Sequence, residues 1–365
     1  MAFFSAVFFS ISAIDYLFDN RLGLGEPFKQ GLTTIVELML VMTGFMALTP
    51  WIALHISPLV SPFFASFGCD PSLFAGIILA PDTGGAVLAK EIALNSEAGL
   101  FNGMIVASFL GDMICGGIPM ALMKVRGSQC AAAVKGLLFA FVVLPFAILI
   151  TGALCGFSFL MMWKNTWPVA IFAVILMLLF RFFSSAMVPF FSGFSLVLRS
   201  ISIFGFCLSV IQESTGIVWL SGLTPLQEIF PVICQIGVFL GGILPFFSLV
   251  QRLLKRPLTA LSKKLHVQSK SISDLVITTA NHVPVLLSLD QLEESEITFV
   301  VAYAMLCSFT IGDFLAFALQ YAPTIALPMM FGRLISGFLV LAVIATLRRI
   351  SQKEKKQGIS PDAST

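Results

Sequence analysis

Three aspartates stand in stretches of the chain that are otherwise apolar. Asp82 interrupts the first of these stretches, and Asp112 and Asp313 lie near the middle of two others. An aspartate at the centre of a membrane helix costs about 3 kcal/mol even on the gentler insertion scales, so three of them are expected to have a function. Carboxylates at this depth neutralise a cation or relay protons.

The same carboxylates are compatible with three alternative roles. One or more is protonated, or pairs with Lys90 or Arg333, and only holds helices together. An intramembrane aspartyl protease would instead use Asp112 and Asp313 as acid and base. Against the protease, Thr310-Ile311 stands where a G-x-G-D motif has its first glycine, and no Tyr-Asp pair precedes Asp112. A channel-like facilitator is the third alternative, because it also uses a polar site at the midplane.

The composition is that of a chain embedded in a membrane. Hydrophobic residues make up 58% of the 365 positions and charged residues 11%, whereas a soluble domain has more than twice that share of charge. A net charge of +2 without a basic stripe argues against nucleic-acid binding. The seven cysteines include no C-x-x-C pair and most lie in apolar runs, so we expect them to be core residues without metal or disulfide roles. We also expect no cofactor and no catalytic residue.

Apolar segments recur along nearly the whole chain and are joined by short polar loops, which predicts an all-α polytopic membrane protein. They are Phe3–Phe18, Thr33–Ser57, Leu73–Leu94, Leu100–Met123, Leu137–Met162, Pro168–Phe180, Val197–Ile211, Leu226–Val250, Ile272–Leu289, Ile297–Leu319 and Thr324–Leu347.

The positions of Lys and Arg predict the topology. They gather in four places, at 21–29, 124–135, 252–270 and in the tail after Leu347. The positive-inside rule places all four in the cytoplasm. If Leu73–Leu94 crossed the bilayer fully, the basic cluster at 124–135 would lie outside the cytoplasm. If Ile272–Leu289 crossed it fully, the basic tail would lie outside. We therefore predict that both are re-entrant, from opposite sides, which leaves about nine spans.

The two re-entrant segments belong to an internal repeat. In each half, a span with a late proline (Pro50 or Pro245) precedes the broken segment, and a span with a Gly-Asp pair follows it. This order predicts an inverted-topology repeat, as in many transporters. The alternative is two kinked helices that match by coincidence. The predicted organisation is one transmembrane transport domain at 1–347, with repeats at about 31–123 and 226–347, and a disordered basic cytoplasmic tail at 348–365.

Each broken segment places polar groups at membrane depth. A backbone that stops being helical there must be buried in protein or line a cavity, and its freed groups can bind a polar solute. Glu37 is left out of the predicted site, because it lies in the first turns of its span. The predicted substrate-binding residues are Asp82, Thr83, Gly84, Gly85, Asp112, Asn281, His282 and Asp313.

Several strings of residues resemble a known family of bacterial membrane proteins. They are Cys69-Asp70-Pro71-Ser72-Leu73-Phe74-Ala75-Gly76, Asp82-x-Gly84-Gly85, Leu88-Ala89-Lys90-Glu91, Thr279-Ala280-Asn281, Gly312-Asp313-x-Leu315-x-Phe317, Pro323 and Leu327-Pro328. Through them the chain resembles the ethanolamine permease family over about 31–347. The resemblance implies a permease of the bacterial cytoplasmic membrane, surrounded by lipid, that moves a small amine and has no enzymatic activity. Whether it forms a homo-oligomer is left open.

The implied substrate fits the residues. Ethanolamine is an ammonium ion at neutral pH and carries a hydroxyl two carbons away, so it needs a carboxylate and a hydrogen-bonding group. The three aspartates supply the first, and Thr83, Asn281 and His282 supply the second. The chain departs from the family pattern at His282, at Phe314 and across 319–323. If those positions contact the substrate, affinity or substrate identity is expected to differ.

Overall fold

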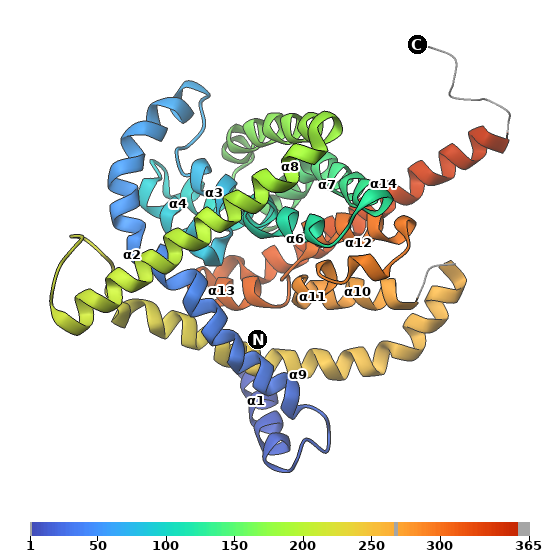
Figure 1. Cartoon of the computed structure of the whole chain (residues 1–365), viewed down its shortest axis with the longest axis horizontal. Helices are drawn as coiled ribbons and strands as arrows, with labels where there is room; N and C mark the ends of the chain where they lie inside the picture. Colours follow the sequence, from blue (N-terminus) through green and yellow to red (C-terminus); the bar gives the residue numbers. More distant parts are fainter. Residues whose placement is uncertain (1, 266–268, 357–365) are drawn as a thin grey trace.

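The computed structural model describes residues 2–265 and 269–356, and all regular elements in these two ranges are helical. Up to residue 123 they are α1 (Ala2–Leu17), α2 (Gly25–Ser66), α3 (Leu73–Ile78), η1 (Pro81–Gly85), α4 (Ala86–Ile92), α5 (Ser96–Leu100), η2 (Phe101–Gly111), η3 (Met113–Gly117) and α6 (Ile118–Met123). The elements after residue 123 are α7 (Gly127–Leu154), α8 (Phe159–Thr215), α9 (Leu226–Leu265), α10 (Ser269–Ala280), α11 (Val283–Leu286), η4 (Leu289–Gln291), α12 (Glu294–Cys307), α13 (Asp313–Tyr321) and α14 (Pro323–Lys356). The predicted all-α polytopic class is confirmed (Figure 1).

Six helices in the described ranges are long and apolar enough to cross a membrane. They are Gly25–Ser66, Ser96–Met123, Gly127–Leu154, Phe159–Thr215, Leu226–Val250 and Pro323–Ile350. The sequence predicted about nine spans. Three of the predicted spans account for the difference. Helix α1 is shorter than a span needs to be, the segment α12–α13 is interrupted, and two predicted spans form the single helix α8.

Helix α8 replaces two predicted apolar segments by one bent helix. Its 57 residues would extend about 85 Å if straight, far more than the thickness of a bilayer. The backbone leaves helical geometry at Phe183, just before the Ser184-Ser185 pair and Pro189, and such residues are common causes of kinks. Figure 1 shows the two arms of α8 meeting at this bend. Much of α8 is exposed and apolar, as expected for a helix that faces lipid.

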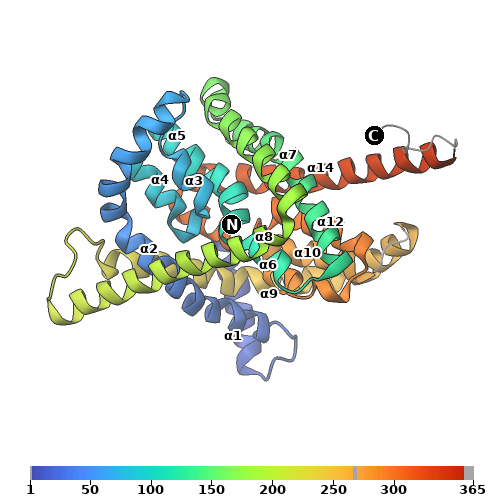
Figure 2. The same cartoon turned by 45° about the horizontal axis from the view of Figure 1, so that its top comes forward.

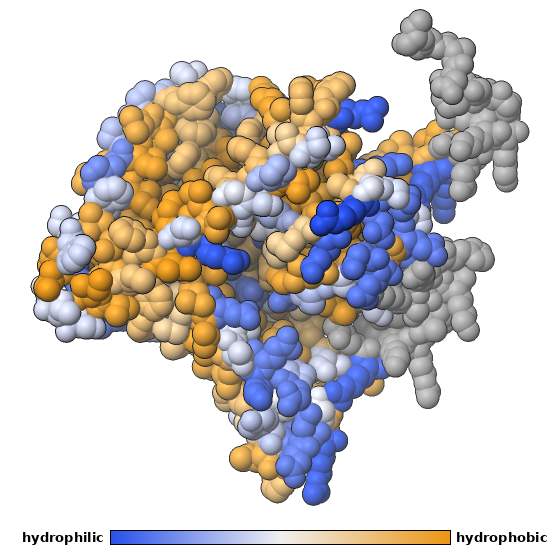
Figure 3. Space-filling model, in the orientation of Figure 1, coloured by the Kyte–Doolittle hydropathy of each residue, from blue (hydrophilic) through white to orange (hydrophobic). Residues whose placement is uncertain are grey.

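The ends of α7 define two faces of the molecule, about 42 Å apart. At its start, the Gln129 side chain donates hydrogen bonds to the carbonyls of Asp290 (3.1 Å) and Leu292 (3.3 Å). Near the same place the Arg348 guanidinium donates to the carbonyl of Ser295 (2.7 Å). We call this end the basic face, because Lys124, Arg126 and Arg348 lie in its loops and helix ends. In Figure 3 hydrophobic residues cover most of the upper left of the view, and hydrophilic residues gather toward the lower right.

The opposite end of α7 is joined to the loops of the first half. The backbone N–H of Ser158 donates to Glu97 Oε1 (2.8 Å), and the N–H of Asp70 donates to Asn165 Oδ1 (3.1 Å). We call this end the distal face. The two faces therefore differ in sequence content as well as in position.

The tail begins as a continuation of the last helix. We predicted disorder over 348–365, but α14 continues to Lys356. Arg348 explains part of this, because its guanidinium lies over the ring of Phe299 on α12, 4.0 Å from the centroid. Residues 357–365 lie outside the described ranges.

Candidate functional site

The break predicted in the first half lies between α3 and α4 (Figure 2). Leu79 and Ala80 are extended, so α3 ends after six residues, and Gly84 has a φ of +103°. The Ala80 carbonyl accepts hydrogen bonds from Thr83 Oγ1 (3.1 Å) and from the N–H of Gly85 (3.0 Å). These bonds satisfy part of the backbone that the break frees.

Both ends of this broken segment lie at the distal face. Asp70 precedes α3, and its Oδ2 accepts hydrogen bonds from the N–H groups of Leu94 (3.1 Å) and Asn95 (2.9 Å), which follow α4. One carboxylate thus joins the beginning of the segment to its end. The residues that precede α3 and those that follow α4 are therefore neighbours in space.

The break predicted in the second half lies between α10 and α11. Asn281 Oδ1 accepts a hydrogen bond from the N–H of Val283 (2.8 Å), the first residue of the four-residue helix α11. His282 is fully buried, and neither of its ring nitrogens has a hydrogen-bond partner. Its ring lies 4.6 Å from the ring of Phe309, measured between centroids. Of the two polar residues expected at this break, His282 is therefore inside the protein, and Asn281 is partly exposed.

A third break, at residues 308–312, was not predicted. The predicted Ile297–Leu319 helix ends at Cys307, and a new helix, α13, begins at Asp313. Phe309 has a φ of +52°, a strained conformation for a residue with a side chain. The N–H of Ile311 donates to the carbonyl of Thr279 (2.8 Å), so contact with α10 holds this stretch out of helical geometry.

The Gly-Asp pairs of the two halves pack in the same way. A Cβ added to Gly111 would overlap the carbonyl oxygen of Leu79, where α3 ends. A Cβ added to Gly312 would overlap the carbonyl oxygen of Ala280, where α10 ends. In each half the glycine therefore allows its helix to approach the carbonyl at the break, and the next residue is the aspartate.

The three predicted aspartates come together between these breaks. Asp313 is close enough to Asp82 and Asp112 to interact with both electrostatically. Asp82 is 8% exposed and Asp112 is 5% exposed, and Asp313 is partly exposed. Asp112 Oδ2 accepts a hydrogen bond from Ser308 Oγ (2.6 Å), whereas Asp82 Oδ1 has no hydrogen-bond partner. Glu37 on α2, which was not among the predicted site residues, also lies within electrostatic range of Asp313.

Arg333 on α14 joins the two halves of the site. Its guanidinium donates hydrogen bonds to the backbone carbonyls of Ser108 and Ser308 (2.8 Å to Ser308), which precede the two Gly-Asp pairs. It also lies over the rings of Phe109 and Phe314, at 4.7 and 5.0 Å from their centroids. The sequence showed a lone arginine in an apolar segment but gave it no role beyond pairing with an aspartate.

The charges of this region are unbalanced. Among the residues whose side chains the structure describes, Arg333 is the sole buried Lys or Arg, and its hydrogen bonds go to carbonyl and hydroxyl oxygens. Lys90, the other predicted partner, is exposed. Asp82 and Asp112 lie within electrostatic range of this guanidinium, and Asp313 lies within range of those two aspartates, so acidic groups outnumber basic ones in this region. The gap beside Thr310, Phe314 and Arg333 is too narrow for a water molecule, so the site is closed around Arg333.

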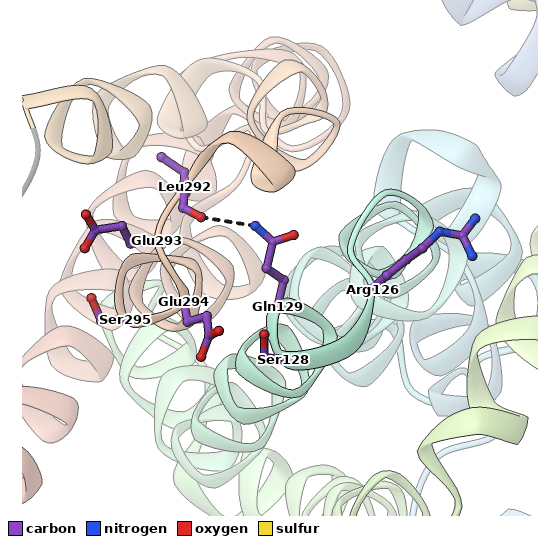
Figure 4. Close-up of a pocket in the computed structure, with 7 residues that line it drawn as sticks. All are labelled: Arg126, Ser128, Gln129, Leu292, Glu293, Glu294 and Ser295. Atoms are coloured by element: carbon purple, nitrogen blue, oxygen red, sulfur yellow. Dashed lines mark hydrogen bonds between the residues drawn. The ribbon is translucent and has the colours of Figure 1, made fainter.

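A larger hollow lies elsewhere, at the basic face (Figure 4). It has a volume of about 620 Å³ and opens widely to the outside. It is lined by Arg126, Ser128, Gln129, Leu292, Glu293, Glu294 and Ser295. The dashed hydrogen bond from Gln129 to the Leu292 carbonyl marks where α7 begins beside the loop before α12. None of the predicted site residues lines this hollow.

Tyr321 connects the end of α13 to the first broken segment. Its hydroxyl donates to the carbonyl of Ala86, the first residue of α4 (3.0 Å), and its ring stacks on that of Phe317. Tyr321→Phe keeps the ring but removes the hydrogen bond, so we expect the free energy of unfolding to fall by about 1 kcal/mol. The thermal unfolding midpoint in detergent measures this. Tyr16→Phe is the control, because Tyr16 is exposed and should give no change; equal midpoints for both variants would contradict the role of the Tyr321 hydroxyl.

The chain was compared with known proteins. A family model described as ethanolamine utilisation protein, EutH, matches residues 1–347. A probable ethanolamine permease of Listeria monocytogenes is 32% identical over 350 residues, covering 96% of this chain and 94% of that protein. Proteins of the same description from Salmonella typhimurium and Escherichia coli are 30% and 29% identical, over 89% of this chain and 86% of each relative. The comparison with solved structures gives no match. On the length of these matches, the chain belongs to the EutH family of ethanolamine utilisation proteins.

Proposed function

We propose that this protein is a permease that moves ethanolamine across the bacterial cytoplasmic membrane. The observation that carries the proposal is the closed cluster of three aspartates beside two helix breaks, with one guanidinium among them. Such a cluster suits a small organic cation. The relatives with the printed name probable ethanolamine permease support the identity of that cation.

The proposed binding mode assigns one group to each end of the substrate. The ammonium lies between Asp82, whose free carboxylate oxygen can accept from it, and Asp313. Asp112 adds negative charge while Ser308 orients it. The hydroxyl bonds to His282, whose ring nitrogens are free, with Thr83 and Asn281 nearby in the two breaks. Gly84 and Gly85 shape the first break around this site, because a Cβ on Gly84 would meet Phe45 and one on Gly85 would meet the Ala80 carbonyl.

We further propose that the two halves are inverted repeats at 31–123 and 226–347 within one domain, 1–347. This is supported by the matching positions of Gly111 and Gly312, because a Cβ added to either one would overlap a backbone carbonyl at the break in its half. The first broken segment has both ends at the distal face, and the second ends beside Gln129 at the basic face. These positions support re-entrance from opposite sides. The positive-inside rule then puts the basic face and the C-terminus in the cytoplasm.

Transport is proposed to proceed by alternating access, with one part of the molecule rocking against the other. The closed site corresponds to an occluded state. Arg333 and Tyr321 connect the halves, so their bonds are expected to change in each cycle. The site does not favour the aspartyl protease alternative, because Asp112 accepts a hydrogen bond from Ser308. The relatives are also named as permeases and not as proteases.

The deciding experiment is uptake of labelled ethanolamine by vesicles that contain the purified protein. Saturable uptake with counterflow is expected, with competition by other small amines and imposed pH and sodium gradients to identify any coupling ion. Flux that does not saturate would indicate a channel. Cleavage of a membrane-anchored reporter peptide without uptake would favour the protease and overturn the proposal.

A further inference from the structure

A row of polar side chains lies along one face of α10. Ser271, Asp274 and Thr278 are spaced three and four residues apart, so they share a helical face, and His282 follows four residues later at the break. These four side chains are at most 5% exposed. The other face of α10 carries Val276, which is partly exposed. The polar row therefore points into the protein and the apolar side points out, which is the reverse of a helix in water.

Several atoms of this row lack a hydrogen-bond partner. They are Ser271 Oγ, Thr278 Oγ1 and both ring nitrogens of His282. On other helices several buried hydroxyls donate to the carbonyl one turn earlier, as Thr49 does to Phe45 at 2.8 Å. Buried polar groups are normally satisfied by protein or by water. Because the hydroxyls of Ser271 and Thr278 and the ring of His282 have no partner in the protein, we expect a polar molecule from outside the chain to satisfy them.

The alignment of these atoms distinguishes α10 from other helices. Hydroxyls without a partner also occur singly, at Ser12, Thr43, Thr151 and Thr166, on four different helices. In α10 two such hydroxyls share a face that leads to a histidine. His282 in turn lies close enough to Asp112 and Arg333 to interact electrostatically with both. One end of the row therefore reaches the aspartate cluster.

The other end of the row, Ser271, follows directly on the basic stretch 252–270 in the sequence, which the positive-inside rule places in the cytoplasm. We propose that this face of α10 is the cytoplasmic half of the solute path. The hydroxyls of Thr278 and Ser271, together with the Asp274 carboxylate, bind a small hydroxylated ammonium ion in passing between the aspartates and the cytoplasm. This inference rests on the proposed permease function and adds Ser271, Asp274 and Thr278 to its pathway.

The first test is accessibility of a cysteine at position 278. Thr278→Cys and the control Val276→Cys are made in a chain whose seven natural cysteines are replaced, and are treated in inside-out vesicles with a cationic, membrane-impermeant thiosulfonate. Thr278→Cys should react, and ethanolamine should slow the reaction. Val276→Cys should not react. An unreactive Thr278→Cys would overturn the inference, and Ser271→Cys repeats the test if Thr278→Cys does not fold.

The second test measures transport. Thr278→Val keeps the side-chain shape but removes the hydroxyl, and should lower uptake roughly fivefold at low ethanolamine concentration. Val276→Thr, the reverse change on the other face, should leave uptake unchanged. Normal uptake by Thr278→Val would contradict the inference while leaving the permease function standing. No uptake by the unaltered protein would refute the permease function, and cysteine reactivity would still report whether the α10 face is open to the cytoplasm.

Discussion

Asp82→Asn is expected to lower ethanolamine uptake at low substrate concentration about a hundredfold. Asparagine has nearly the same shape but no charge, so the substrate ammonium loses a buried partner whose oxygen is otherwise free. Because Asp82 is engaged by few protein groups, the fold should survive the change. Initial rates of labelled-ethanolamine uptake in vesicles, normalised to inserted protein, measure the effect.

The matched control for this prediction is Glu91→Gln on the same broken segment. Glu91 is exposed at the end of α4, so neutralising it should leave uptake near its original rate. Equal losses in both variants would indicate a general effect of charge near the membrane surface. Unchanged uptake by Asp82→Asn would remove Asp82 from the binding site. Alanine at Asp112 or Asp313 should also reduce uptake, since both belong to the same cluster.

The sequence predicted the first two breaks because both contain residues that disfavour helix and because charge parity required them. Pro81 and the Gly84-Gly85 pair stand in the first, and Asn281 and Pro284 stand at the second. Each of these residues acts locally, through its own backbone or side chain. Local chemistry of this kind can be recognised in one chain without knowledge of its neighbours.

The third break and the role of Arg333 depend on contacts between distant segments. Residues 308–312 contain no proline, and the conformation of Phe309 is held partly by the bond from Ile311 to Thr279. Arg333 acts through the carbonyls of Ser108 and Ser308, which are far from it in sequence. No pattern within either segment predicts such contacts. For the same reason the sequence placed Glu37 at the interface, whereas the structure brings it near Asp313.

The predicted spans also differ in whether the segment itself or a contact with a distant segment determines the structure. Most apolar segments became helices near the expected residues, because twenty apolar positions favour a membrane helix wherever they occur. The join between Pro168–Phe180 and Val197–Ile211 was missed, since the residues between them continue the helix through the bend at Phe183. The helical start of the tail was missed because Arg348 packs on α12.

Gly111→Ala and Gly312→Ala are each expected to lower the free energy of unfolding by about 3 kcal/mol, the upper end of the usual cost of overpacking, and to abolish uptake. Each new methyl group would overlap a backbone carbonyl, that of Leu79 or that of Ala280, and a backbone carbonyl cannot move aside as a flexible side chain does. Thermal unfolding in detergent and the yield of folded protein measure the effect. Gly193→Ala in α8 is the control, because a Cβ there meets no atom, and alanine is the better helix former.

The comparison between the two glycine variants tests the repeat itself. If the halves are related by symmetry, each Gly-Asp helix needs the same close approach to its own broken segment, and both variants should be damaged alike. Damage in only one of them would mean that the other glycine is not required at its break, and the similarity of the halves would then be coincidental. Damage in both, with a stable Gly193→Ala, would tie each aspartate to the break beside it. The position of the acids would then follow from glycine packing, and the substrate would bind where the two breaks meet.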